Sequence, residues 1–157
     1  MGNPPLIVGL LINGAAYAVL FIGVALLIAR FTREIFWRSF LVGFLFIAAG
    51  LYIVFAARGD EGALWLVGEL VGVAVFGGMG LRGLRGSRWW LVAGWALHPL
   101  WDVGLHYLGP GSSFAPRTYT IACLSFDLLV AGYIAVAPKS GLRHGGRLPL
   151  RDNARLS

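Results

Sequence analysis

Five apolar runs, each long enough to form a membrane-spanning helix, constrain this chain more than any other feature. They cover residues 6–29, 40–57, 63–81, 89–108 and 119–137. A bilayer core about 30 Å thick takes roughly 20 residues of helix, and 58% of the residues are hydrophobic while only 13% are charged. The sequence therefore predicts an all-α integral membrane bundle of five transmembrane helices over residues 1–138. A basic tail follows over residues 139–157.

The basic residues predict how the bundle lies in the membrane. Eleven of the 13 fall in the first loop, the third loop and the tail, whereas Arg58 and Arg117 fall in the other two loops. The positive-inside rule then places the N-terminus outside and the tail in the cytoplasm of a multi-pass cell-membrane protein. The net charge of +6 is thus a topology signal. We expect the lipid bilayer as a partner and no nucleic acid, because the cations are scattered and form no binding module.

Polar side chains interrupt four of the five runs at similar depth. They are Asn13, Glu69, His98, Asp102, His106 and Asp127. At 1.5 Å per residue, most of these groups lie about 9–16 Å from the outer ends of their helices, and His106 lies about 4 Å in. Ionisable groups are costly in lipid and are by default candidates for a functional site. We therefore expect Glu69, Asp102 and Asp127 to face one interior cavity, with His98 beside it.

The fourth run carries the densest part of this pattern. His98, Asp102 and His106 follow one another at intervals of four residues, which places all three on one stripe of a helix. Either histidine could share a proton or a divalent metal ion with Asp102. Pro99 is expected to kink the helix beside His98. The predicted catalytic residues are Asp102, His98, Asp127 and Glu69, and the same four would be the ligands if a metal ion is bound.

Further residues on the same faces predict the walls of a substrate pocket. Substrate-binding roles are expected for Asn13, Tyr17, Trp65, Trp101 and His106. Simpler roles stay open for some of them. Asn13 could be a polar contact between helices, and His106 could reach interfacial water. A buried His–Asp or His–Glu pair could also serve only to lock the bundle.

One segment of the fourth run resembles a known signature. The stretch from His98 to His106, with Trp101 and Asp102 inside it, is similar to the His/Trp-Asp/His helix of a family of small bacterial integral membrane proteins of unknown function. That resemblance implies no activity. Five helices with buried histidines, carboxylates and tryptophans also resemble the sterol-isomerase (EXPERA) membrane fold as a loose analogy. Seven-helix ceramidase-like hydrolases need three His ligands and fit less well.

Three function classes remain after the pattern is weighed. Retinal binding is excluded because Lys139, the single lysine, lies outside the runs, and bis-histidine haem across two helices is excluded because both membrane histidines share one helix. The first hypothesis is an enzyme that acts on a lipophilic small molecule by acid–base or metal-assisted chemistry. The alternatives are a proton- or cation-coupled transporter and an accessory subunit with a structural polar cluster. A homo-oligomer is compatible with all three.

Overall fold

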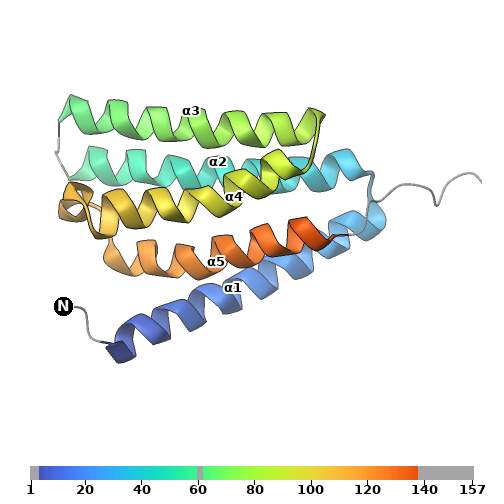
Figure 1. Ribbon diagram of the computed structural model, residues 1–157, viewed down its shortest axis with the longest axis horizontal. Helices are drawn as coiled ribbons and strands as arrows, with labels where there is room; N and C mark the ends of the chain where they lie inside the picture. The colour runs from blue at the N-terminus through green and yellow to red at the C-terminus, as the bar shows by residue number, and fades with distance from the viewer. Residues whose placement is uncertain (1–3, 60–61, 138–157) are drawn as a thin grey trace, which may run out of the picture.

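A computed structural model describes residues 4–59 and 62–137, and every regular element within them is helical (Figure 1). The five α-helices alternate in direction along the bundle. Two short helical segments, η1 and η2, lie between the fourth and fifth α-helices. The bounds are α1 Pro4–Phe31, α2 Glu34–Arg58, α3 Ala63–Arg85, α4 Trp89–Asp102, η1 Val103–Tyr107, η2 Pro110–Ser113 and α5 Arg117–Val136.

Four of these helices, α1, α2, α3 and α5, are long and apolar enough to cross a membrane. This agrees with the all-α membrane bundle expected from the sequence. The fourth apolar run is not one continuous α-helix, because α4 ends at Asp102 and the chain continues through η1. The basic tail predicted for residues 139–157 lies outside the described residues.

The change of helix type after Asp102 follows from the backbone hydrogen bonds. Pro99 lies inside α4, and its ring leaves a carbonyl of the preceding turn without its usual amide partner. The following segment is a π-helix, in which the amide of Leu108 donates to the carbonyl of Val103 at 2.9 Å. π-turns of this kind often lie at functional sites. His106 lies in this segment and is buried.

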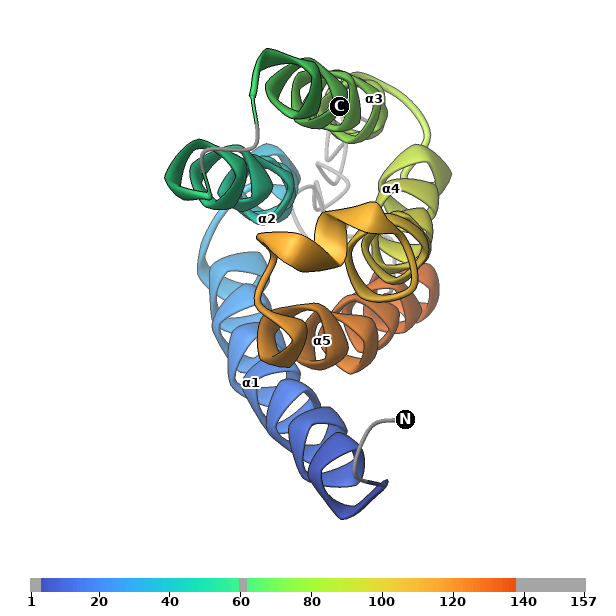
Figure 2. The same ribbon diagram turned by 90° about the vertical axis from the view of Figure 1, so that its left-hand side faces the viewer.

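The helices form a ring in which each packs on its neighbours, and α1 and α2 make the sparsest of these neighbour contacts (Figure 2). α1 packs mainly on α5, and its N-terminal end leans away from the bundle (Figure 1). The buried face of α1 is a stripe of mostly small residues, Gly14, Ala18, Phe21 and Ala25. A Cβ at Gly14 would lie 2.1 Å from the Ala122 carbonyl oxygen, so the α1–α5 crossing requires glycine there.

The bundle divides along its length into two halves. The apolar half is the end with the α1–α2 and α3–α4 loops, and its interior is defined by Leu41, Leu45, Leu91, Val130 and Ile134, all fully buried. The polar half is the opposite end. Its interior is defined by Glu69, His98, Asp102, His106 and Asp127, which are also buried.

Two arginines cap helix ends in the apolar half. The Arg38 guanidinium donates to the carbonyl oxygens of Gly83 and Gly86, each at 2.7 Å, at the end of α3. Arg88 donates to the carbonyl of Ala137 at the end of α5. The last carbonyls of a helix lack partners within it and carry partial negative charge. These cations therefore satisfy backbone groups as well as collecting at one end of the bundle.

Candidate functional site

Three fully buried side chains from two helices converge in the polar half. His98 Nδ1 and Asp127 Oδ2 form a hydrogen bond of 2.8 Å, and Asp102 Oδ2 lies 3.6 Å from the same nitrogen. His98 is 1% exposed, and both aspartates are 0% exposed. We call His98, Asp102 and Asp127 the triad.

Local structure explains why the triad forms. His98 and Asp102 are four residues apart on α4, so their side chains lie one above the other on the same face. Asp127 lies on the buried face of α5, which also carries Thr120 and Cys123. The packing of α4 against α5 brings the two faces together.

A second buried pair lies beyond the triad toward the helix ends. His106 Nε2 and Glu69 Oε1 of α3 form a hydrogen bond of 2.9 Å, and the two residues are 0% and 2% exposed. The Tyr52 ring of α2 stacks on the His106 ring, with centroids 3.8 Å apart and planes at 12°. The Tyr52 hydroxyl lies 3.4 Å from the Thr120 hydroxyl. Four elements, α2, α3, η1 and α5, therefore meet around this pair.

The segment η2 explains why His106 is buried although it lies near the end of its helix. Gly111 of η2 approaches the imidazole so closely that an added Cβ would lie 2.7 Å from His106 Cδ2. Phe114 lies beside the same ring, with centroids 5.8 Å apart. The sequence left open whether His106 reaches interfacial water. The fold covers it with protein instead.

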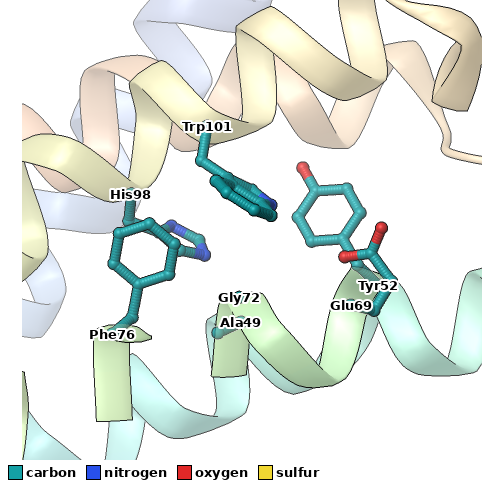
Figure 3. A pocket seen from close by; sticks show the side chains of 7 residues that line it. All are labelled: Ala49, Tyr52, Glu69, Gly72, Phe76, His98 and Trp101. Carbon is teal, nitrogen blue, oxygen red and sulfur yellow. The ribbon is translucent and has the colours of Figure 1, made fainter. Parts of the chain in front are cut away.

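One narrow pocket borders both groups (Figure 3). His98 and Trp101 reach it from α4, Glu69 and Phe76 from α3, and Tyr52 from α2. The space is too small to hold a water-sized group. The pocket nevertheless links the triad to the Glu69–His106 pair, because His98 and Glu69 line the same space. The remaining lining residues are Ala49 and Gly72.

Several polar atoms of these residues have no hydrogen-bond partner among the described residues. They are His98 Nε2, both carboxylate oxygens of Asp102, Asp127 Oδ1 and His106 Nδ1, and the indole nitrogen of Trp95, three residues before His98 on α4, is a further one. An unpaired buried polar group costs about 1–3 kcal/mol. Each such group in a native protein calls for an explanation, and a catalytic role or a bound partner is one of them.

The predicted pocket walls divide into two groups. Trp101 lines the narrow pocket, and Trp65 packs against Phe114, with centroids 5.1 Å apart. Asn13 is exposed on α1 and does not join the cluster. Tyr17 is 63% exposed and lines a separate cleft between α1, α2 and α5. The structure therefore brings together Glu69, His98, Trp101, Asp102, His106 and Asp127, and it leaves Asn13 and Tyr17 outside.

Tyr52 is the residue of this region that the sequence reasoning overlooked. It is 1% exposed and contacts both the His106 ring and Thr120. A signal was present, because Tyr52 lies six residues before Arg58, the last residue of α2. That offset corresponds to a depth of about 9 Å, the same as expected for Glu69. An aromatic hydroxyl this far from the helix end does not belong to an interfacial belt.

The triad also fits a metal ion by its donor set. One ligand atom from each of His98, Asp102 and Asp127 can be chosen so that all lie within 4.8 Å of one another. One imidazole nitrogen and two carboxylates suit Zn²⁺ in a catalytic site, which has three protein ligands and an open position. The charges of such a site also balance, because the carboxylates of Asp102 and Asp127 together neutralise one divalent cation. If no metal is bound, protons on the triad must neutralise the carboxylates instead, since a buried unpaired charge is very costly.

This arrangement can therefore move a proton or bind a cation within an apolar surrounding. The His98–Asp127 hydrogen bond fixes the imidazole orientation and leaves Nε2 free to act as an acid or base. Asp102 adds a second carboxylate next to that bond. Proton transfer by positioned histidines and carboxylates is general acid–base chemistry.

Comparison with known proteins identifies the family but assigns no activity. The chain matches the family described as "Family of unknown function (DUF6010)" over residues 11–140, and it belongs to that family. The matched region includes every residue of the triad and of the Glu69–His106 pair. No curated protein and no solved structure matches the chain significantly.

Proposed function

We propose that this member of the DUF6010 family is a membrane-embedded enzyme that transfers protons to and from a lipophilic substrate. The triad supplies the acid–base groups, with His98 in the central role and Asp102 and Asp127 as its partners. The observation that carries this proposal is the set of unpaired atoms. His98 Nε2, both Asp102 oxygens and Asp127 Oδ1 are buried without a partner among the described residues.

The proposal includes five transmembrane helices, with α4 and η1 together forming the fourth. Their 14 and 5 residues sum to 19, close to the roughly 20 that a bilayer core takes. The N-terminus is then outside and the tail cytoplasmic. On this orientation the polar half lies in the outer leaflet, and the apolar half lies in the inner leaflet.

The distribution of buried polar groups favours an enzyme over a transporter. A conduit for protons or cations needs polar groups along the whole path. Among the described residues, the buried carboxylates and imidazoles all lie in the polar half. The interior of the apolar half is formed by aliphatic and aromatic side chains, with one hydrogen bond from the Trp37 indole to the Tyr133 hydroxyl at 3.0 Å. A site that ends inside the membrane suits a reaction pocket better than a channel.

Solvent-proton exchange tests the acid–base function on a whole mixture of lipids at once. The purified protein in nanodiscs is incubated in D₂O with lipids extracted from membranes that express it, and the lipids are analysed by mass spectrometry. We expect the wild type to introduce deuterium into C–H positions of one lipid class, whereas Asp102→Asn and His98→Ala do not. Leu27→Ala, at a residue 58% exposed on α1, is the matched control and keeps the exchange. Equal lipid spectra for wild type and Asp102→Asn would contradict the proposal.

Metal-assisted chemistry is the second candidate, and the spacing of the triad donors favours it. A bound divalent ion would polarise a carbonyl or activate a water molecule. Elemental analysis of the purified protein tests this candidate. About one equivalent of metal in the wild type, lost in Asp127→Asn and retained in Leu27→Ala, would support it. If the protein is metal-free and still exchanges deuterium, the metal-assisted candidate is ruled out and the acid–base candidate remains.

A further inference from the structure

A cleft of about 340 Å³ lies between α1, α2 and α5, on the opposite side of the triad from the narrow pocket. Small-molecule sites usually measure about 300–1,000 Å³, so the cleft is large enough to bind a ligand. Its residues include Tyr17 on α1, Phe44 and Leu51 on α2, and Phe126 on α5. The surface of the cleft is almost entirely hydrocarbon.

The cleft is open toward the face of the bundle that lipid covers. Tyr17, Phe44 and Ile47 line it, and they are 63%, 40% and 56% exposed. The lining residues of α1 and α2 belong to two helices that touch only sparsely, and α1 leans away from the bundle toward its N-terminal end (Figure 1). A molecule dissolved in the bilayer therefore reaches this cleft sideways, without passing through water.

Two buried polar groups belong to residues at the inner wall of this apolar space. Asp127 lines the cleft and has an unpaired carboxylate oxygen, Oδ1. Trp95 also lines it, and its indole N–H has no acceptor among the described residues. Both side chains are 0% exposed. One unpaired acceptor and one unpaired donor are the complement of a hydroxyl group, which donates one hydrogen bond and accepts another.

We infer that this cleft binds a single-chain amphiphile from the bilayer, with its chain between α1 and α2 and its hydroxyl head toward Trp95 and Asp127. At about 340 Å³ the cleft lies at the lower end of the range for small-molecule sites. A space of this size suits one hydrocarbon chain better than the two chains of a phospholipid. The inference deepens the proposed function, on which it rests for the reaction at the triad. Asp127 then serves as the link, because it contacts His98 at 2.8 Å and borders the cleft.

Photolabelling with a long-chain alcohol that carries a terminal diazirine tests the inference in nanodiscs. We expect cross-links in the peptides that line the cleft, around Tyr17, Phe44 and Leu51. Ala48→Phe places a ring in the cleft, because Ala48 lines it, and labelling of these peptides is expected to fall about tenfold, the factor that 1.4 kcal/mol gives. Ala16→Phe is the matched control, because Ala16 is exposed on α1 and does not line the cleft.

The head group is tested by competition with unlabelled probes. We expect the alcohol to displace the label better than an alkane of the same length, and Trp95→Phe together with Asp127→Asn to remove that difference. Cross-links spread evenly over the exposed residues of α1, α2 and α3, or equal labelling of Ala48→Phe and Ala16→Phe, would overturn the inference. Cross-links to a second copy of the chain at these peptides would also overturn it.

The two proposals fail separately in these experiments. Asp102 does not line the cleft, so Asp102→Asn is expected to keep the labelling while it loses deuterium exchange. If Asp102→Asn shows normal labelling and unchanged deuterium exchange, the proposed acid–base function is contradicted and the proposed chain-binding cleft is supported. If labelling of the cleft peptides is no longer specific but deuterium exchange still depends on Asp102, the chain-binding cleft is ruled out and the acid–base function remains.

Discussion

The two halves of this bundle bury opposite kinds of side chain. In the apolar half, Leu41, Leu45 and Leu91 are fully buried, and the arginines at its end satisfy helix carbonyls. In the polar half, the buried groups are carboxylates and imidazoles, and several of their atoms lack a partner among the described residues. The first arrangement stabilises the fold, and the second costs free energy. Natural proteins retain such costs mainly where function needs them.

The largest effect on stability is therefore expected in the apolar half. Leu45 is 0% exposed and packs close to Gly80 and Gly94. Leu45→Ala removes these contacts and leaves a cavity, so the free energy of unfolding should fall by about 2–5 kcal/mol. Thermal unfolding in detergent measures it. Leu27→Ala, on the exposed face of α1, should change stability by no more than about 0.5 kcal/mol, and similar losses in both variants would break the comparison.

The next effect has the opposite sign and lies in the polar half. Both carboxylate oxygens of Asp102 are buried without a hydrogen bond, and Oδ2 lies 3.6 Å from His98 Nδ1, beyond hydrogen-bond distance. Asp102→Asn therefore removes a potential charge without losing a hydrogen bond. We expect unfolding stability to stay equal or to rise by up to about 3 kcal/mol, while deuterium exchange is lost. Thermal unfolding and the exchange assay on the same sample check both parts. A loss of stability as large as that of Leu45→Ala would mean that Asp102 holds a partner such as a metal ion.

The sequence could predict the depth of the polar groups but not all of their pairings. Counting residues along helices places Glu69, Asp102 and Asp127 at similar heights, and the three are buried in the same half of the bundle. His106 lies in η1, so the residue that it contacts depends on the geometry of that segment, and no residue pattern there predicts a π-turn. The straight-helix stripe of His98, Asp102 and His106 therefore could not reveal that one histidine bonds Asp127 and the other Glu69.

The polar residues also could not predict which face of α1 packs against the bundle. This helix is apolar around its whole circumference, so a hydrophobic face carries no information about burial in lipid. Gly14, Ala18 and Ala25 form much of its buried face, as expected where helices associate in membranes through small residues. A prediction based on small residues instead of polar ones would have turned Asn13 outward and predicted the α1–α5 contact.

A moderate effect is expected at the end of the apolar half. Arg38 donates to the carbonyls of Gly83 and Gly86 and also to Glu34. Arg38→Ala leaves those two carbonyls without this donor, and stability should fall by about 1–2 kcal/mol because hydrogen bonds from charged groups are the stronger ones. Chemical unfolding in mixed micelles measures this change. Arg33→Ala, at an exposed position in the adjoining loop, serves as the control, and an equal loss there would assign the effect to general charge instead of capping.

The smallest effect is expected at Asn13, and it sharpens the boundary of the polar half. Asn13 is exposed on α1, whereas the face of this helix that packs on α5 is formed by Gly14 and Ala18. Asn13→Leu should therefore change stability by no more than about 0.5 kcal/mol and leave deuterium exchange and chain labelling unchanged. Light scattering of the same variant reports whether this face of α1 contacts another copy, because an asparagine amide in lipid gains about 0.6–2 kcal/mol from a partner helix. Loss of exchange in the monomeric variant would place Asn13 in the site after all and would extend the polar half across α1.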